Sequence, residues 1–236
     1  MGAIFTGNDD KKMIVNSKKI IKQTTQFVQE YFQKEGTGHD WWHTQRVRDL
    51  ALKIAKNEGG DLFVVEMVAL LHDIGDYKFF NGNEQQGQNV LAQFLHSLHL
   101  PPEITRSILD IAINISYMKT LSKKKLSLKK KKSPEFMAVS DADKLDAIGA
   151  VGIARVFTYG GYYHRPIYDP NISPNPDISR EEYMTTEAPS INHFYEKLLK
   201  LKDMMYTDYG KQLALGRHRF LEEYLERFYA EWKGEK

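Results

Sequence analysis

Four residues of types that bind divalent metal ions lie in three separate apolar segments of the chain. His43 lies in GHDWWHTQRV, the adjacent pair His72-Asp73 closes the apolar run VALLHD, and Asp143 lies in MAVSDADKLDAIGA. Polar side chains in such segments are buried on folding, and each then needs a partner that offsets its lost hydration. Two imidazoles and two carboxylates would enclose a divalent cation if the three segments pack side by side.

The spacing of these residues restricts how they can meet. Consecutive residues of a helix point about 100° apart, so His72 and Asp73 reach one ion only at a helix end or a distortion. Gly75 lies just beyond the pair and permits such an end, and Asp143 and Asp146 share nearly one face of another helix. A mixed imidazole–carboxylate site favours Mn, Fe, Co, Ni, Zn or Mg, with positions left for water. An ion of this kind lowers the pKa of bound water and polarises a phosphoryl oxygen.

Helical periodicity dominates the chain, and no sustained strand-like alternation occurs, so we predict an all-α fold. Gly59-Gly60 ends one helix and Asp61 is placed to cap the next, over 62–74. That helix is apolar nearly all round and is therefore expected to be central and buried. Helices are expected over residues 20–32, 39–57, 62–74, 83–98, 102–116, 135–159 and 203–232. The last two ranges each hold one helix or two, with a break near Gly149–Gly152 in the first of them.

The composition of the chain excludes several kinds of protein and of chemical site. The 236 residues carry a formal net charge of +2, which gives no whole-protein field for nucleic acid or a membrane surface. The absence of cysteine excludes disulfides, thiolate zinc sites and cysteine nucleophiles, and it suits a cytoplasmic location. No apolar run approaches the roughly 20 residues of a membrane span. We expect residues 1–14 to form a disordered arm and residues 15–236 to fold as one domain, completed by C-terminal helices over 187–233.

Two long stretches interrupt the helical pattern. Residues 119–133 contain KKKLSLKKKK, which is a solvated loop, a phosphate-attracting flap or an RNA-contacting patch. Because aromatic residues are not interleaved with the lysines of 123–132, a dedicated nucleic-acid surface is not favoured. Residues 160–187 are rich in proline, aromatic and basic residues, and a loop of this length in a compact domain is either a lid or a surface excursion.

Several motifs together resemble a known family. The arrangement H…HD…D is typical of the HD-domain metal-dependent phosphohydrolases. The segments GHDWWHTQRVRDLA, LLHDIGDYKF, INISY, VSDADKLDAIGAVGIARVFTYGG and GRHRFLEEYLERFYAEW look like a subfamily of small bacterial HD hydrolases. The resemblance runs from about residue 18 to residue 232. It implies a single HD-domain helical bundle with a long irregular loop after the last metal-ligand helix. Members of this subfamily include nucleoside triphosphate pyrophosphohydrolases that use a manganese-type ion.

The resemblance also implies a ligand set of His43, His72, Asp73 and Asp143. Among the neighbouring aspartates, Asp143 is chosen because Ala142-Asp143-Lys144 matches the Ala-Asp-basic context of the family ligands. Members with several metals carry further histidines, whereas Asn114 occupies the subfamily position in INISY here. One divalent ion is therefore expected, manganese first, with Mg, Co, Ni, Fe or Zn as alternatives.

Three residues near the ligands are candidates for catalytic or supporting roles. His39 precedes His43 by one helical turn and either faces the same cavity or caps the helix. Asp76 follows Gly75 and either activates water or caps the loop. Asp146 either supports a ligand from outside the ligand set or pairs with a nearby lysine or arginine.

Phosphate charge requires cations in addition to the metal. Arg46 and Lys78 are the favoured phosphate ligands, with a surface salt bridge as the alternative for each. Lys144 adjoins Asp143 but points in a less suitable direction. Tyr163 and Arg165 belong to a segment that could close over a base and sugar, with a tyrosine ring stacked on the base.

These observations favour a cytoplasmic metal-dependent phosphohydrolase that converts a nucleoside triphosphate to its monophosphate and pyrophosphate. The alternatives are a nucleotidase, a hydrolase of another phosphomonoester or phosphodiester, and a metal-bound nucleotide sensor without turnover. An RNA-binding protein that uses the lysine run is a third class. The expected partner is a phosphorylated small molecule; nucleic acid and membrane are not expected, and a homodimer is left open.

Overall fold

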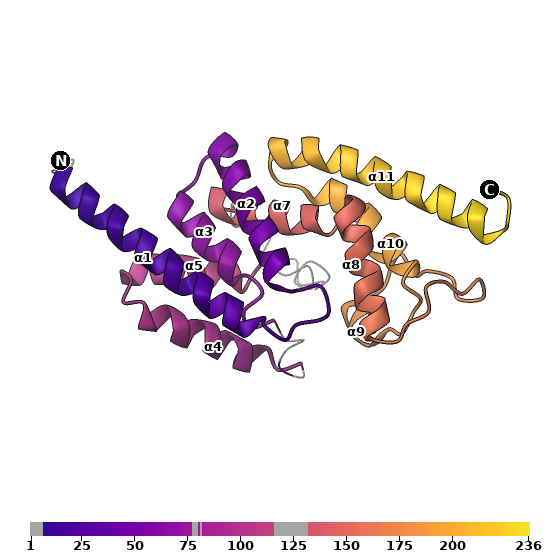
Figure 1. Cartoon of the computed structure of the whole chain (residues 1–236), viewed down its shortest axis with the longest axis horizontal. Helices are drawn as coiled ribbons and strands as arrows, with labels where there is room; N and C mark the ends of the chain where they lie inside the picture. The colour runs from indigo at the N-terminus through magenta and orange to yellow at the C-terminus, as the bar shows by residue number, and fades with distance from the viewer. Residues whose placement is uncertain (1–6, 77–79, 81, 116–131) are drawn as a thin grey trace.

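The computed structural model describes residues 7–76, 80, 82–115 and 132–236, and this part of the chain contains helices and no strand, which confirms the all-α prediction. Figure 1 shows the order of the elements along the chain. The helices are α1 Gly7–Tyr31, α2 Trp41–Glu58, α3 Leu62–Leu71, α4 Glu84–Ser97, α5 Pro102–Ala112, α7 Pro134–Asp146, α8 Gly149–Tyr162, α9 Arg180–Thr185, α10 Asn192–Glu196, the 3-10 helix η3 Leu198–Met204 and α11 Asp208–Trp232. Within the described residues, no helix has both the length and the apolarity that a membrane crossing requires.

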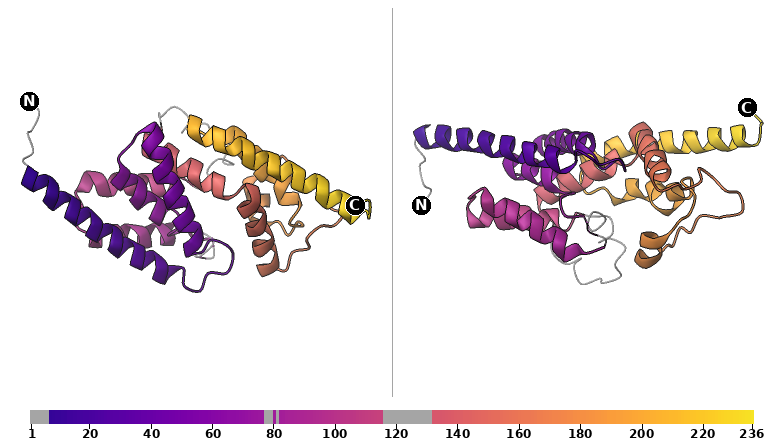
Figure 2. Two further views of the ribbon diagram at one scale, coloured as in Figure 1. Left: turned by 45° about the horizontal axis from the view of Figure 1, so that its top comes forward. Right: turned by 60° about the horizontal axis from the view of Figure 1, so that its bottom comes forward.

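The helices form two groups joined by α7. In Figures 1 and 2, α1 to α5 gather on one side, α8 to α11 gather on the other, and α7 runs between them. Helix α7 contacts α2 and α3 in the first group and α8 and α11 in the second. Any site built from the end of α3, the start of α2 and the face of α7 therefore lies where the two groups meet.

Helix α3 is the centre of the first group. Its sequence, LFVVEMVALL, is apolar nearly all round, and it packs against α1, α2, α5 and α7. Met67, Leu70 and Leu71 are fully buried. A helix with neighbours on every side cannot offer a polar face to solvent, which explains why this one lacks the usual amphipathic pattern.

Side-chain caps set where the site helices begin. Asp40 accepts a hydrogen bond from the backbone N–H of His43 and starts α2, while Asp61 caps α3 through Phe63 and Val64. Each cap satisfies donors that the first helical turn leaves unpaired. The rotational positions of His43 on α2 and of the residues at the end of α3 follow from these starts.

One boundary differs from the sequence prediction, and the structure selects between the alternatives left open at two others. The expected arm over 1–14 is helical from Gly7, since its charged residues suit the start of a helix; residues 1–6 lie outside the described part. Residues 135–159 hold two helices, because the chain turns at Gly149 with a φ of 76°. Residues 208–232 form one helix.

The segment after α8 is irregular apart from α9, and it is attached along its length. The backbone N–H groups of Ser190 and Ile191 donate to the carbonyls of Pro166 and Ile167. The buried side chain of Asn192 donates to the carbonyl of Ile172 at 3.0 Å. These bonds hold the segment against α10, so it forms a fixed wall on this side of the molecule.

Two glycine backbones touch where α4 approaches the end of α3. A Cβ on Gly87 would lie 2.1 Å from the carbonyl oxygen of Gly75, and Gly75 itself has a φ of 89°. Real Cβ atoms never lie this close to an oxygen, so any side chain at Gly87 must push α4 away. The contact therefore fixes the position of the turn that follows His72 and Asp73.

We expect Gly87→Ala to lower the free energy of unfolding by about 1–3 kcal/mol, the usual cost of forcing extra atoms into a packed contact. The matched control is Gly216→Ala in α11, where an added Cβ meets nothing within 4 Å. That change lowers the backbone entropy of the unfolded chain at an exposed helical position. It should raise the free energy of unfolding by about 0.5–1 kcal/mol. Urea unfolding of both variants measures the difference, and equal stability of the two would contradict the tight contact.

Candidate metal centre

Four acceptor atoms converge where α2, α3 and α7 meet. The Nε2 atoms of His43 and His72 lie 3.2 Å apart. Asp73 Oδ2 lies 3.3 Å from His43 Nε2 and 3.5 Å from His72 Nε2. Asp143 Oδ1 lies 3.6 Å and 3.8 Å from the same two nitrogens. The structure thus brings the four predicted ligands together from segments up to a hundred residues apart in the chain.

The tautomers of the two histidines show that this cluster needs a cation. His72 Nδ1 lies 2.8 Å from the carbonyl oxygen of Ala69, which only accepts, so this nitrogen carries the proton. His43 Nδ1 lies 2.7 Å from Asp146 Oδ2 and likewise donates. Both Nε2 atoms then present lone pairs to each other and to two carboxylates. Four acceptors at this spacing repel one another unless a metal ion lies among them or an imidazole takes up a second proton.

The spacing fits a metal ion. A metal–ligand bond of about 2.1 Å places neighbouring ligand atoms about 3.0–3.4 Å apart in tetrahedral or octahedral geometry. The measured separations of 3.2–3.8 Å need only small movements to reach this range. Two overlapping groups of three residues could each hold an ion. One is His39, His43 and Asp73, and the other is His43, His72 and Asp143. The donor set suits a divalent ion of the Mn, Fe, Co, Ni or Zn type.

A turn after α3 lets two adjacent residues reach one point. Helix α3 ends at Leu71, three residues before the predicted end, and His72 is its C-cap residue. The backbone N–H of Asp76 donates to the carbonyl of Asp73, and Gly75 takes a positive φ. The regular helix therefore ends at the pair, as expected for two adjacent residues that both reach one point.

Asp146 supports the cluster from behind His43. Its carboxylate accepts hydrogen bonds from His43, from Arg46 at 2.7 and 3.0 Å, and from Arg155 at 3.1 Å. Burial by itself would raise the pKa of Asp146, but these donors outweigh burial and hold the pKa far below its ordinary value. The ionised carboxylate fixes the His43 ring and its tautomer, as carboxylates behind metal-bound histidines commonly do.

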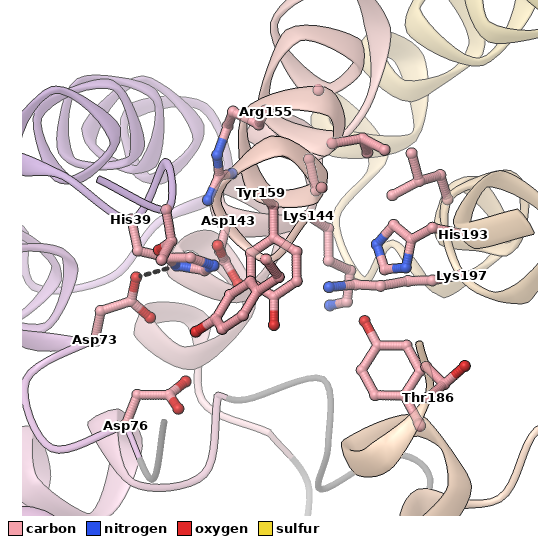
Figure 3. A pocket seen from close by; sticks show the side chains of 18 of the residues that line it. His39, Asp73, Asp76, Asp143, Lys144, Arg155, Tyr159, Thr186, His193 and Lys197 are labelled. Carbon is pink, nitrogen blue, oxygen red and sulfur yellow. Dashed lines mark hydrogen bonds and ion pairs between the residues drawn. The ribbon is translucent and has the colours of Figure 1, made fainter. Parts of the chain in front are cut away.

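The cluster opens onto a cavity of about 760 Å³. Figure 3 shows His39, Asp73, Asp76 and Asp143 at one end of it. His43 does not line the cavity, because its side chain is fully buried behind the others. The remaining wall comes from α8, from the segment around α9, and from α10 and η3. A molecule bound here would touch the metal cluster with one end only.

Comparisons with known proteins agree with this geometry. Residues 41–148 match the HD domain family, and this range contains all four converging residues. The YpgQ protein of Bacillus subtilis is 36% identical over 214 residues, which cover 89% of this chain and 93% of YpgQ. The crystal structure of an HD-superfamily hydrolase from Bacillus thuringiensis is 40% identical, with a TM-score of 0.68, and the match covers 92% of this chain and 98% of that one. The chain belongs to the HD superfamily of hydrolases.

Other solved structures of relatives have the same fold. A Lactobacillus plantarum protein superposes with a TM-score of 0.81 at 34% identity, over 92% of this chain and 98% of its own. YpgQ in complex with ADP superposes with a TM-score of 0.69 at 31% identity, over 92% of this chain and all of YpgQ. The resemblance to HD hydrolases stated from the motifs is thereby confirmed over nearly the whole chain.

Four of the other predicted site residues of this HD hydrolase line the cavity. His39 lines the cavity and its Nδ1 lies 2.9 Å from Asp73 Oδ2, so it contacts a ligand directly. Asp76, Tyr163 and Arg165 also line the cavity. Lys78 lies outside the described residues, as do residues 123–131 of the lysine run. These positions leave the predicted roles of His39, Asp76, Tyr163 and Arg165 open to test.

Asp146 and Arg46 do not line the cavity. Asp146 contacts His43 and pairs with arginines, which are the two alternatives given for it from the sequence. Arg46 pairs with Asp146 through two hydrogen bonds, which is the salt-bridge alternative for this residue. The reason is the packing of α2 on α7, which turns both side chains to the side of His43 away from the cavity.

Other cavity residues were not identified from the sequence as binding residues. Lys144 does line the cavity although it follows Asp143, because its long stem turns back along α7 to Ser140. His193 and Lys197 carried no recognised motif; their separation of four residues was the only signal available. The set that sequence reasoning left unassigned is Lys144, Arg155, Tyr159, Tyr183, His193 and Lys197.

We expect Asp146→Asn to weaken binding of Mn²⁺ by about 10–100-fold, because the His43 ring loses its anionic partner. Isothermal titration of the metal-free protein with Mn²⁺ measures the effect. Asp208→Asn, at an exposed position at the start of α11, is the control and should leave the affinity unchanged. An unchanged affinity in Asp146→Asn, in a protein that keeps its helical circular dichroism, would refute the supporting role.

Proposed function

We propose that this HD hydrolase uses a divalent ion, manganese first, to convert a nucleoside triphosphate to its monophosphate and pyrophosphate. The observation that carries the proposal is the cavity, which joins a cluster of four converging metal-ligand atoms to a wall of tyrosines and cations. A nucleotide has matching parts, since its phosphates seek metal and cations while its base seeks aromatic rings. The ADP complex of YpgQ supports a nucleotide as the ligand.

His43, His72, Asp73 and Asp143 would hold the ion. When bound there, the ion would neutralise phosphate charge and supply an acidified water. His39 orients the Asp73 carboxylate through the 2.9 Å contact with Oδ2. The Asp40 carboxylate accepts a hydrogen bond from the backbone N–H of His43 and thereby fixes the start of the helix that carries this histidine.

Asp76 is the residue we propose as the group that orients and deprotonates the attacking water. It lines the cavity three residues after Asp73, on the turn closed by the bond from its N–H to the Asp73 carbonyl. It is not one of the four converging ligands, so its carboxylate can accept a proton from water. Figure 3 shows Asp76 beside the metal end of the cavity.

Tyrosines at the end of α8 provide the proposed surface for the base. The ring centroids of Tyr159 and Tyr163 are 4.6 Å apart, and Tyr163 is 46% exposed. The Arg165 guanidinium lies 5.3 Å from the Tyr159 centroid and donates to the carbonyl of Thr186, which fixes it against the ring. A nucleobase can stack on such a surface without specific hydrogen bonds, which leaves base preference to other contacts.

The direct test is release of pyrophosphate and orthophosphate from a panel of nucleoside mono-, di- and triphosphates with Mn²⁺, Mg²⁺, Co²⁺ or a chelator. We expect metal-dependent pyrophosphate release from triphosphates. Asp73→Ala should abolish it, because the ion loses a carboxylate ligand that also contacts three histidines. Orthophosphate release from monophosphates would instead assign a nucleotidase, and metal and nucleotide binding without turnover would assign a sensor.

Asp76→Asn separates chemistry from metal binding. We expect kcat to fall by about 10²–10⁴-fold, the usual contribution of a positioned general base, while the Mn²⁺ affinity stays near that of the wild type. Asp203→Asn, at an exposed position outside the cavity, is the matched control. Steady-state kinetics and metal titration of the same preparations give both quantities. A normal kcat in Asp76→Asn would remove Asp76 from the mechanism.

A further inference from the structure

The charges that line the cavity are unevenly distributed. Near the end of α3 and the start of α4 the wall carries Asp73, Asp76 and Glu84, with Asp143 beside them. Across from these, Figure 3 shows Lys144, His193 and Lys197 pointing into the cavity from α7 and from the region of α10. A polyanion that reaches past the metal toward this second side would meet two lysines and an imidazole.

Lys144 lies close to the metal ligands and lines the cavity. It directly follows Asp143, so their Cα atoms are about 3.8 Å apart. Its Nζ donates to Ser140 Oγ at 2.6 Å, lies 3.9 Å from Asp141 Oδ1, and stands 4.7 Å from the centre of the Tyr206 ring. These contacts keep the stem against α7.

His193 and Lys197 add two more donors on one face of α10. The backbone N–H of Lys197 donates to the carbonyl of His193 at 3.0 Å, so the two residues lie one helical turn apart. The His193 ring also lies beside Tyr183, with 5.8 Å between ring centroids. An imidazole N–H and an ammonium at this spacing can each bind a different phosphate oxygen.

We infer that Lys144, His193 and Lys197 form a site for the two terminal phosphates of a nucleoside triphosphate, which places the α-phosphate at the metal. This inference rests on the proposed function and specifies which bond breaks. The water oxygen bonds to the α-phosphorus, the bond from that phosphorus to the bridging oxygen breaks, and the diphosphate leaves with the electron pair. The water proton passes to the Asp76 carboxylate and then to solvent.

The position of these cations distinguishes pyrophosphate release from orthophosphate release. If the terminal phosphate were at the metal, the nucleoside would have to lie against two lysines and an imidazole. If the α-phosphate is at the metal, the same groups face four or more phosphate oxygens of the leaving diphosphate. Charge-assisted hydrogen bonds of this kind contribute about tenfold or more in affinity each.

The test compares binding of α,β-methylene-ATP and of AMP to the Mn²⁺-loaded protein by titration calorimetry. We expect Lys197→Met, which keeps the aliphatic stem, to weaken binding of the triphosphate analogue by about tenfold or more. The affinity for AMP should stay unchanged. His193→Phe, which keeps a ring beside Tyr183, should do the same. Lys197→Arg should restore most of the analogue affinity.

Lys202→Met is the control, because Lys202 belongs to η3, pairs with Asp203 and does not line the cavity. If Lys197→Met weakened the binding of AMP and of the analogue equally, or weakened the binding of neither, the diphosphate site would be overturned. The readout does not need turnover. If the wild type released no pyrophosphate, the proposed function would fail while the binding comparison still decided the diphosphate site.

Discussion

Electrostatic repulsion among four convergent acceptor atoms is the constraint on which this structure depends. The Nε2 atoms of two imidazoles lie 3.2 Å apart, and each lies 3.3–3.8 Å from the Asp73 and Asp143 carboxylates in a nearly buried position. Without a cation, like partial charges at this distance in a medium of low dielectric would push the helices apart. The packing of α2, α3 and α7 must therefore hold the groups together until a metal ion binds, and metal binding should in turn stabilise the fold.

The Asp146 network supplies part of that restraint. One buried carboxylate on α7 binds His43 and Arg46 of α2 and Arg155 of α8, so three helices are tied at a single point. A buried carboxylate with three cationic or N–H partners is satisfied, whereas removal of one partner leaves an uncompensated charge. The same contacts orient the His43 ring toward the metal. The free energy of unfolding and the affinity for the metal therefore both depend on Asp146.

The two ends of the cavity are built from different parts of the chain. The metal end is built from residues within the HD domain match, 41–148, whereas the tyrosines and most of the distal cations come from α8 to α10, beyond it. A shared metal platform with a variable wall is the usual way one fold serves several substrates. In this protein the variable wall is attached to the core through α7, which carries Asp143 and Lys144 on consecutive residues.

The sequence by itself determined the helical class and the central position of α3, and it supplied the residue types of the candidate metal cluster. These follow from local periodicity and from side-chain chemistry, and the turn at Gly75 was visible because glycine permits it. Tertiary structure alone decided that Arg46 faces Asp146 and that His193 and Lys197 reach the cavity. Those outcomes depend on which helix faces pack together across a hundred residues of chain, and local patterns do not carry that information.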